Sequence, residues 1–350
     1  MIRAVILANE IPEDHILWIK ACDAFKHEIT YKVVNIFSDD WLEKIKEINC
    51  DILLLKPPGI SSLFKQVYDE RTFILNRVLN YTIYPTLSEV LIYENKRFFY
   101  SWLKANKLSH PETHIFLEKE NAIEFAENTK FPIVTKTNIG ASGSGVKILE
   151  NKKECLAYVK KVFSDQGIKR RWGPNWAKGN LIKRGLQYLK EPKDIKVKLE
   201  IYNKVRKEVQ KDFVIFQKYI PHDFEWRVVA IDDSYFAHKK LKIGEKASGT
   251  TLKKYDNPPL KLFYFAKEIM DKFNFTSQAF DIFETNSGEL LINEMQCIFG
   301  QSDPYQMLMD GIPGRYRFIK DKWIFEKGDF NKNESYNLRV EHVIKLLKDV

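Results

Sequence analysis

Residues Phe131–Leu149 read FPIVTKTNIGASGSGVKIL. Two short apolar runs, Ile133-Val134 and Val146–Leu149, flank a segment rich in glycine and serine, which predicts a strand, a loop and a strand. Because glycine has no Cβ, the backbone N–H groups of such a loop can approach an anion and surround it. The stretch therefore predicts a phosphate site formed by the loop and the lysine before it: Lys136, Gly140, Ser142, Gly143, Ser144 and Gly145.

The same loop also fits a simpler interpretation, in which glycine and serine only make a hairpin connection mobile. Its spacing matches neither the Walker pattern nor the G-x-G-x-x-G pattern that opens a helix. A P-loop and a Rossmann dinucleotide site are therefore disfavoured. Whether the loop binds phosphate or is only a mobile connection has to be judged from other parts of the chain.

The composition of the 350 residues, 44% hydrophobic and 29% charged, is that of a soluble globular protein and predicts two or three domains. No stretch approaches the roughly 20 apolar residues that a membrane helix needs. The first residues lack the long apolar core of a signal peptide. The four cysteines show neither a CxxC pair nor metal-ligand spacing, so we expect reduced thiols and a cytoplasmic protein.

The net charge of +9 is concentrated in residues 164–212, which hold 14 Lys or Arg against six Asp or Glu. Because the rest of the chain is nearly neutral, a nucleic-acid partner is disfavoured. This segment follows a predicted helix over Lys152–Phe163 and is longer than an ordinary loop, so we interpret it as an insertion. Its basic residues, together with Trp172 and Trp176, predict an anionic partner, and a solvated helical face is the alternative.

Strands and helices alternate over residues 2–85, with predicted strands at Arg3–Ala8, Lys32–Phe37 and Asp51–Leu55. Such alternation predicts a parallel sheet. Ligands bind parallel sheets at the carboxyl ends of the strands. The loop Pro57-Pro58-Gly59, which follows the third strand, therefore either lines a substrate pocket or is a simple turn. The next predicted helix, Leu87–Asn106, carries Lys96 in its middle, where a lone lysine is usually solvated.

A second informative stretch, Gln278–Gly300, reads QAFDIFETNSGELLINEMQCIFG and predicts two strands around a turn at Asn286-Ser287-Gly288. A turn centred between Asn286 and Ser287 places Asp281 opposite Ile292. Glu294 and Gln296 then follow on the same face, because side chains alternate along a strand. Carboxylates among apolar neighbours are costly unless they are neutralised. The row Asp281, Glu294 and Gln296 therefore predicts a Mg²⁺ site, and a solvent-facing polar strand face is the alternative.

Taken together, these features resemble the ATP-grasp superfamily, and the resemblance covers nearly the whole chain. It implies an α/β protein that is α+β in its C-terminal half. Residues 1–88 would form an N-terminal parallel-sheet domain that precedes the ATP-grasp fold proper. Residues 89–217 would form the central domain with the glycine-rich loop and the insertion 164–212, and residues 218–350 the C-terminal domain with the metal site.

The resemblance also implies roles for individual residues. Lys96 and Lys136 match the two lysines that hold ATP phosphates in the family, and Glu225 and Arg227 match an acid that meets the ribose and an arginine at the developing oxyanion. Lys239 and Lys240 compete for the γ-phosphate, Lys240 being the one we assign to catalysis. The hinge that reads adenine corresponds to Gln217, Lys218, Tyr219 and Ile220, and the metal ligands to Asp281, Glu294 and Gln296, the last being asparagine in the family's usual pattern.

Members of the family that resemble this chain are carboxylate–amine ligases, such as glutathione synthetase and the ribosomal-protein glutamate ligase. The implied reaction uses ATP and two Mg²⁺ ions, or Mn²⁺, to join a small-molecule or glycan-linked carboxylate to an amine through an acylphosphate. A small-molecule kinase on the same fold and a non-catalytic ATP-binding protein are the alternatives. The loop Gly300–Tyr316 is expected on the acceptor side, with Arg315 and Arg317 as anion anchors.

Overall fold

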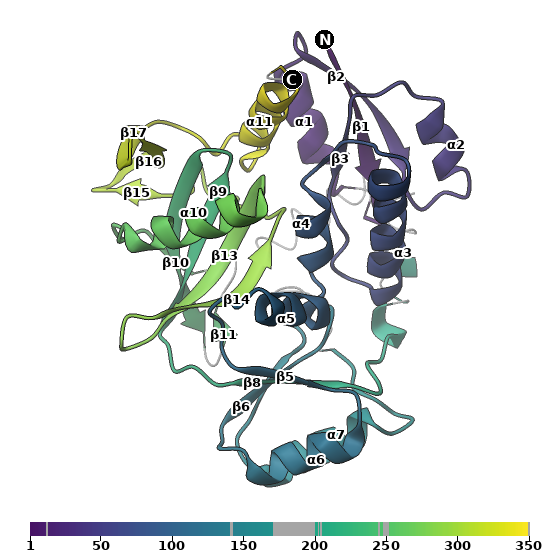
Figure 1. Cartoon of the computed structure of the whole chain (residues 1–350), viewed down its shortest axis with the longest axis vertical. Helices are drawn as coiled ribbons and strands as arrows, with labels where there is room; N and C mark the ends of the chain where they lie inside the picture. The colour runs from purple at the N-terminus through teal and green to yellow at the C-terminus, as the bar shows by residue number, and fades with distance from the viewer. Residues whose placement is uncertain are drawn as a thin grey trace, which may run out of the picture.

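The computed structural model describes residues 1–348 except for residues 12, 141–142, 171–199, 202, 204, 244–245 and 248–251. Three sheets follow one another along the chain, and helices lie between and against them (Figure 1). None of the helices among the described residues combines the length and the apolar character that crossing a membrane requires.

The N-terminal sheet is parallel, with the order β2-β1-β3-β4. Its strands β1 and β3 are continuous apolar runs, which is typical of strands that are covered on both faces. Alternate residues face alternate helix layers: Ala4 and Ile6 pack toward α1 and α11, whereas Val5 and Leu7 pack toward α2 and α3. The bounds are β1 Ile2–Ala8, α1 Ile16–Ala24, β2 Ile29–Asn35, α2 Trp41–Lys46, β3 Ile52–Leu55, α3 Ser62–Phe73, the π-helical turn η1 Ile74–Val78 and β4 Ile83–Tyr84.

The last helix of the chain, α11 Tyr336–Lys348, completes this N-terminal unit (Figure 1). The rings of Tyr336 and Trp18 meet edge to face with centroids 4.9 Å apart, and Val340 and Val343 lie in the same core. The boundary at residue 88 stays a prediction, but the core of the unit is shared with the C-terminal end of the chain.

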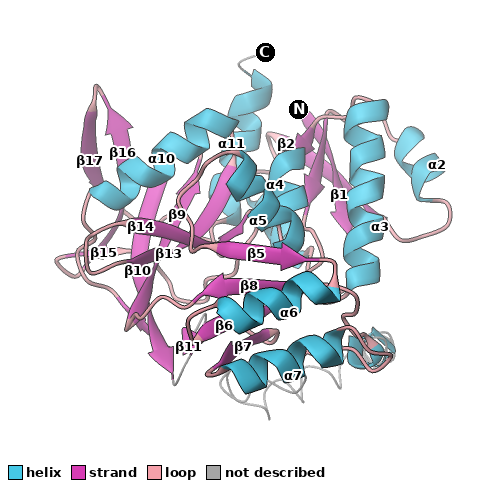
Figure 2. Cartoon of the chain, turned by 60° about the horizontal axis from the view of Figure 1, so that its bottom comes forward, coloured by secondary structure: helices cyan, strands magenta, loops and turns pink. Residues whose placement is uncertain are grey.

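The central sheet is antiparallel, with the order β5-β8-β6-β7, and contains the glycine-rich stretch as the hairpin β6–β7. Figure 2 shows α6 and α7 side by side over one face of this sheet. The elements of this part are α4 Leu87–Ile92, α5 Lys96–Ala105, β5 Thr113–Phe116, α6 Lys119–Asn128, β6 Ile133–Lys136, β7 Val146–Leu149, α7 Lys152–Val162 and β8 Val214–Lys218.

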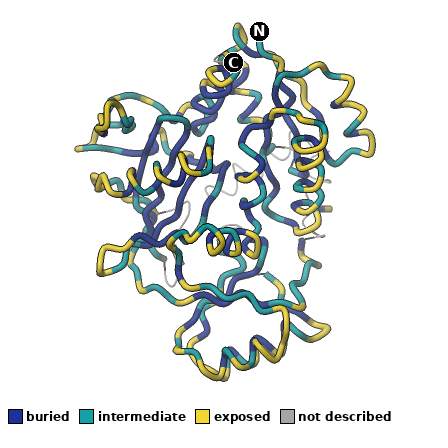
Figure 3. The backbone as a smooth tube through the Cα atoms, in the orientation of Figure 1, coloured by how far each residue is buried: buried dark blue, intermediate teal, exposed yellow. Residues whose placement is uncertain are grey.

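The C-terminal sheet is also antiparallel and runs in the order β14-β13-β9-β10-β16-β15, with β11 and β12 on β10 and β17 on β16. Helix α10 packs against β9 and β10, and Figure 3 shows the strands of this sheet largely buried. The bounds are β9 Phe224–Ile231, β10 Ser234–Ile243, β11 Lys246–Ala247, β12 Lys253–Lys254, α10 Lys261–Phe273, β13 Ser277–Glu284, β14 Leu290–Gln296, β15 Leu308–Met309, β16 Ile312–Ile319 and β17 Lys322–Lys327.

Two expectations about local structure are wrong. The single helix expected over Leu87–Asn106 is two helices, because the chain turns at Glu94, whose φ is 47°. The second helix begins at Lys96, so this lysine occupies a helix N-terminus and not a helix middle. Its cap is Asn95, whose side chain accepts a hydrogen bond from the backbone N–H of Phe98.

The register of the β13–β14 hairpin also differs from the expectation. The connection spans five residues between Glu284 and Leu290, so Ile282 pairs with Ile292. A bulge at Asn293 then brings Asp281 directly opposite Glu294. Asp281 and Glu294 still share one face, but as a directly opposed pair and not as the predicted diagonal pair.

Candidate active site

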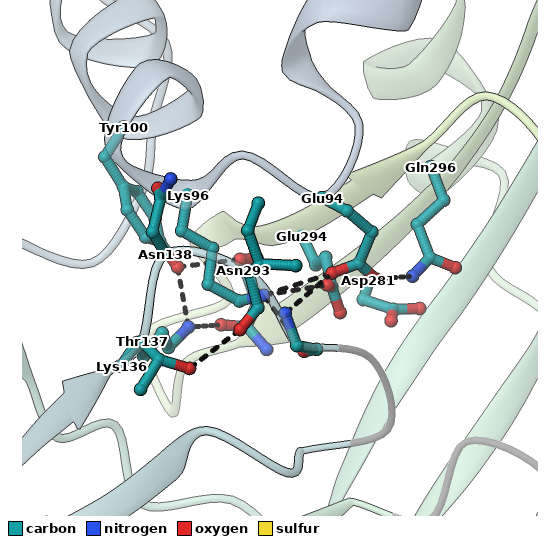
Figure 4. A network of polar contacts seen from close by, with 12 residues as sticks. Glu94, Lys96, Tyr100, Lys136, Thr137, Asn138, Asp281, Asn293, Glu294 and Gln296 are labelled. Atoms are coloured by element: carbon teal, nitrogen blue, oxygen red, sulfur yellow. Dashed lines mark hydrogen bonds and ion pairs between the residues drawn. The ribbon is translucent and has the colours of Figure 1, made fainter. Parts of the chain in front are cut away.

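Charged and polar side chains from four parts of the chain form one network beside the glycine-rich loop, and Figure 4 shows part of it. They come from the start of α5, the end of β6, the facing strands β9 and β10, and the hairpin β13–β14. Four of them are buried cations, at 5–9% exposed: Lys96, Lys136, Arg227 and Lys240. Buried cations are costly unless carboxylates or a bound anion neutralise them.

Lys96 lies between two carboxylates and the loop. Its Nζ is 3.2 Å from the carbonyl oxygen of Gly140, 3.5 Å from Oε2 of Glu94 and 3.8 Å from Oε1 of Glu294. Burial alone would lower the pKa of Lys96, but Glu94 and Glu294 outweigh it and raise the pKa above its ordinary value. The ammonium is therefore charged and faces the loop.

Lys136 is held by neutral partners. Its Nζ donates to the hydroxyl of Tyr100 at 2.6 Å and to Oδ1 of Asn293 at 2.7 Å. Burial lowers the pKa of Lys136 to about 8, because no carboxylate contacts it directly among the described residues. A negatively charged ligand beside Lys136 would raise its pKa again and so favour the charged ammonium.

Asn293 links Lys136 to the rest of the cluster, and its place follows from the bulge in β14. Its Nδ2 donates to Oε1 of Glu225 at 2.8 Å, and its carbonyl accepts from the Tyr100 hydroxyl at 3.1 Å. Sequence reasoning missed Asn293 and Tyr100. A bulge cannot be located from alternation alone, and no spacing pattern distinguishes Tyr100 within the helix expected over Leu87–Asn106.

Arg227 and Lys240 both hold Asp281. Arg227 donates two hydrogen bonds of 2.8 Å to its two oxygens, and Lys240 donates one of 2.6 Å. Lys240 also donates to Oε2 of Glu225 at 2.9 Å. Burial would raise the pKa of Asp281, but the two cations outweigh it and hold that pKa well below its usual range.

The competition between Lys239 and Lys240 has a clear geometric outcome. Successive residues on β10 point to opposite faces of the sheet, and Lys240 faces the cluster. Lys239 instead donates to Asp256 at 2.9 Å and lies over the ring of Phe224 at 4.3 Å. Of the two lysines, the structure brings Lys240 to the other predicted site residues.

Glu94 is a site residue that the sequence did not reveal. Its carboxylate accepts from the backbone N–H of Gly140 at 3.4 Å and from Nε2 of Gln296 at 3.4 Å, and it neighbours Lys96. Burial raises the pKa of Glu94, against the effect of Lys96, and the like charge of Glu294 adds to the rise. Glu94 is buried with a φ of 47°, which is a strained conformation for a residue other than glycine. Residues strained in this way cluster at functional sites. The sequence offers one possible signal for Glu94: Asn95 is a helix cap residue, and a helix predicted to begin after it would have placed Glu94 in the preceding turn.

The glycine-rich loop has one position where a side chain is excluded. A Cβ on Gly145 would lie 1.7 Å from Oγ1 of Thr137, whose backbone N–H donates to the Gly145 carbonyl at 2.9 Å. Gly143 has φ 68°, which also favours glycine. Ser144 lies in the same turn, and Ser142 is outside the described residues. Phosphate binding by this loop stays a prediction.

The residues expected to read adenine follow β8. Gln217 is buried, and its Nε2 donates to Oγ1 of Thr113 at 3.0 Å. Lys218 is exposed, and Tyr219 and Ile220 are half-buried. The Tyr219 hydroxyl lies 3.3 Å from Nζ of Lys242. The role of this hinge in recognising a base also stays a prediction.

The oxygen donors of β14, Glu294 and Gln296, are of the kind that Mg²⁺ takes. Glu294 has a side chain that is 28% exposed, and Oε1 of Gln296 is only weakly engaged, at 3.5 Å from Nη2 of Arg227. Mg²⁺ typically takes one or two protein oxygens and completes its shell with water and phosphate oxygens. Among the described residues no group of three or more His, Cys, Asp or Glu is arranged to hold a metal. Asp281, the third expected ligand, has both carboxylate oxygens engaged by Arg227 and Lys240.

The described ends of the basic insertion contact the N-terminal unit. Arg170 donates to the carbonyl of Ile60 at 2.5 Å and to Oε2 of Glu208 at 2.9 Å. Oε1 of Glu208 accepts from the backbone N–H of Ser62 at 2.9 Å, at the start of α3. Trp172 and Trp176 lie outside the described residues, so the anionic partner stays a prediction.

The two arginines expected as anion anchors are engaged within the C-terminal sheet. Arg315 donates to Oε2 of Glu326 at 2.9 Å, and Arg317 donates to Oδ2 of Asp233 at 2.8 Å. Both arginines belong to β16 and take part in carboxylate pairs. An anion would have to displace these carboxylates, so Arg315 and Arg317 are poor candidates for anion anchors.

Comparison with solved structures identifies the fold: the chain has the ATP-grasp fold. It is similar to the RimK domain ATP-grasp protein of Sphaerobacter thermophilus, with 14% identity, a TM-score of 0.51 and coverage of 84% of this chain and 90% of that one. It is also similar to D-alanine–D-alanine ligase of Bacillus anthracis, with 13% identity, a TM-score of 0.53 and coverage of 100% and 99%.

A third similar structure is N5-carboxyaminoimidazole synthetase of Staphylococcus aureus complexed with ADP, with 10% identity and a TM-score of 0.56, covering 98% of this chain and 77% of that one. No protein-family model and no curated protein sequence matches the chain. The predicted fold is thus confirmed by structure alone, and at these identities the likeness carries no residue roles.

Proposed function

We propose that this protein is an ATP-dependent ligase that joins a carboxylate to an amine and releases ADP and phosphate. The observation that carries the proposal is that Lys96, Lys136, Arg227 and Lys240 belong to one buried network of hydrogen bonds and ion pairs beside a glycine-rich loop. Cations held in a water-poor site stabilise the charge of a transferring phosphoryl group, which asks for little covalent chemistry from the protein. ATP is the polyanion that this cluster and fold fit best.

Each cation has a different surrounding, which supports different roles. Lys96 and Lys136 face the loop from α5 and β6 and would bind the phosphates of ATP. Arg227 and Lys240 are fixed by Asp281 and would stabilise the oxygens of the acyl group as the amine attacks. In this reaction the carboxylate oxygen attacks the γ-phosphorus, and ADP leaves. The amine nitrogen then attacks the acyl carbon, and phosphate leaves with the former carboxylate oxygen.

The site also suits Mg²⁺, which Glu294 would hold with Gln296. When bound, the ion neutralises phosphate charge and fixes the orientation of ATP. A similar structure, the biotin carboxylase domain of Hydrogenobacter thermophilus, is described as a complex with MgADP. Glu225 has both carboxylate oxygens engaged, by Asn293 and Lys240, so contact with a ribose would require one of these hydrogen bonds to open.

The proposal is tested by ADP release in a screen of amino acids, sugar acids and amines, first one at a time and then in pairs. A ligase releases ADP only when a carboxylate and an amine are both present, or at a low rate with the carboxylate alone. Lys136→Met serves as the matched control, because ADP release that survives in this variant does not come from the cluster.

Isotope transfer distinguishes the ligase from a kinase on the same fold. With an ¹⁸O-labelled carboxylate, a ligase transfers one label to inorganic phosphate, whereas a kinase with a hydroxyl acceptor transfers none. Failure of every pair to release ADP, with ATP still bound, would favour a non-catalytic ATP-binding protein.

A further inference from the structure

A second polar cluster lies in the N-terminal sheet, at the carboxyl ends of β1 and β3. Glu10 follows β1, and Lys56 follows β3, the neighbouring parallel strand. Asp14 bridges the two ends, because its Oδ1 is 2.7 Å from Nζ of Lys56 and its Oδ2 accepts from Asn9 at 2.9 Å. Ligands of parallel sheets bind at such strand ends.

Glu10 is the unusual member of this cluster. It is 7% exposed, and neither carboxylate oxygen has a hydrogen-bond partner in the part of the chain that the structure describes. A buried carboxylate without a partner costs free energy that native structures rarely tolerate without a role. The cost shows in its ionisation, since burial raises the pKa of Glu10 to about 8; its own backbone N–H and Lys56 oppose the rise, and Asp14 adds to it.

Two further groups near Glu10 are also buried and without partners among the described residues. They are Nδ1 of His15, which precedes α1, and the hydroxyl of Tyr68, which comes from α3. Tyr68 is within electrostatic range of Glu10, and His15 is within range of Asp14 and Lys56. Glu10 and His15 come from the connection between β1 and α1, and Tyr68 comes from α3, so two segments bring unpartnered polar groups to the neighbourhood of the Lys56–Asp14 pair.

The charges around Glu10 favour a cationic ligand. The charged groups that face it are Asp14 beside α1, Lys56 after β3 and Glu208 from the insertion. Lys56 is paired with Asp14, and Glu208 is paired with Arg170. Once ionised, Glu10 is therefore the carboxylate without a matching cation in this group, and one positive charge on a ligand would balance it.

The position of the cluster connects it to the candidate active site. The loop after Lys56 carries Gly59, where a Cβ would lie 2.9 Å from Cγ of Glu94. Glu94 in turn neighbours Lys96 and the glycine-rich loop. The Lys56–Asp14 pair beside Glu10 is partly open to solvent, with side chains 20% and 28% exposed.

We propose that Glu10 is the carboxylate that binds the amine substrate in its protonated form, before the nitrogen loses its proton and attacks the acyl carbon. The proposal rests on the ligase function above and names the part of the chain that takes one of its two substrates. The Tyr68 hydroxyl and Nδ1 of His15 accept or donate further hydrogen bonds to the same ligand. The subsite therefore selects amines over alcohols of the same shape.

The test compares primary alkylamines of two to six carbons with the alcohols of the same carbon skeletons, titrated calorimetrically into the full chain at pH 7. We expect the best amine to bind at least about tenfold more tightly than its alcohol, as charge-assisted hydrogen bonds are the stronger kind. Glu10→Gln should reduce this preference to within about twofold. The matched control is Glu47→Gln, an exposed acid on the C-terminal side of α2, which should leave the preference unchanged.

Proton release gives a second readout that a purely structural role would not change. At pH 7 Glu10 is largely protonated before binding, given its pKa of about 8, and a bound ammonium would ionise it. Amine binding to the wild type should therefore release protons, measured in buffers of different ionisation enthalpy, and binding to Glu10→Gln should release none. Glu10→Asp keeps the charge and should retain part of the preference.

Equal binding of amines and alcohols by the wild type would overturn the proposal, as would an undiminished amine preference in Glu10→Gln. The thermal shift caused by Mg²⁺-ATP is measured on the same preparations without amine. A normal ATP shift with no amine preference would reject the subsite and leave the ligase proposal standing. An amine preference without any ATP shift or ADP release would reject the ligase and leave the subsite.

Discussion

Asp281 and Arg227 are directly opposed residues of β13 and β9, and two parallel hydrogen bonds of 2.8 Å join their side chains. Asp281 is 1% exposed and Arg227 is 9% exposed, so the pair is largely removed from water. Lys240 adds a second cation at 2.6 Å from the same carboxylate. Asp281, which the sequence suggested as a metal ligand, thus holds two cations in place in this structure.

The first prediction concerns this pair. Arg227→Met should lower the free energy of unfolding by about 3–5 kcal/mol, because removal of one partner leaves a buried group poorly compensated. The loss should fall toward the lower end, since Lys240 still contacts Asp281. Urea unfolding measures it, and Arg77→Met, an exposed arginine of η1, should change stability by less than about 0.5 kcal/mol. A similarly small effect of Arg227→Met would contradict the structural role.

The second prediction concerns Lys136. Its pKa is about 8 in the folded protein and 10.5 when unperturbed, so the unfolded chain binds more protons between these values. The contribution of Lys136 to stability should therefore rise as the pH increases from about 8 to 10.5, and Lys136→Met should abolish this rise. Thermal unfolding of both proteins across this range provides the measurement.

ATP provides a matched readout at the same residue. A polyphosphate near Lys136 favours its charged form, so ATP binding at pH 9 should take up a proton. Calorimetry in two buffers detects this uptake, and it should be absent in Lys136→Met. Binding without proton uptake in the wild type would place the phosphates elsewhere.

The third prediction separates two neighbouring basic residues of the insertion. Arg170 joins the loop at Ile60 to Glu208, whereas Lys169 is exposed. Arg170→Met should cost about 1–3 kcal/mol of stability, because it leaves partly buried acceptors unpaired. Lys169→Met should cost little, and any effect that it has on substrate KM should weaken as salt rises. Equal and salt-dependent effects of both changes would restore the interpretation of a uniformly solvated basic face.

Much of the fold follows from local pattern. The alternation of strands and helices over residues 2–85 predicted the parallel N-terminal sheet, and the glycine-rich stretch predicted the two strands and the loop of the hairpin β6–β7. The residue types of the candidate site also followed, because lysines and carboxylates at regular positions are visible in the sequence. Alternation placed Asp281 and Glu294 on one face, and it did so despite the wrong register.

What the sequence did not reveal depends on backbone irregularities and long-range packing. The bulge at Asn293 and the left-handed turn at Glu94 are single residues that tertiary contacts hold in place, and neither has a propensity signal. Among the described residues Glu10 has no hydrogen-bond partner, and this too depends on how the chain packs around it. Ser142 and residues 171–199 lie outside the described part of the chain, so the expectations there remain predictions.

The last prediction concerns Glu294. Its carboxylate is partly exposed and makes only a long contact of 3.8 Å with Lys96 among the described residues, while its charge disfavours ionisation of the buried Glu94. Glu294→Gln should therefore leave the melting temperature of the ligand-free protein unchanged or slightly raised. As the freest carboxylate beside the four buried cations, Glu294 is the residue best placed to hold Mg²⁺ on ATP.

Loss of this carboxylate should abolish ADP formation and sharply reduce the thermal shift that Mg²⁺ adds to ATP. Glu289→Gln, an exposed acid in the turn of the same hairpin, controls for general effects of charge and should behave as the wild type. Gln296→Asn tests the second oxygen donor and should retain measurable activity if the amide binds the ion. Wild-type turnover by Glu294→Gln would remove the metal site from β14, and with it the chemical centre of the proposed ligase.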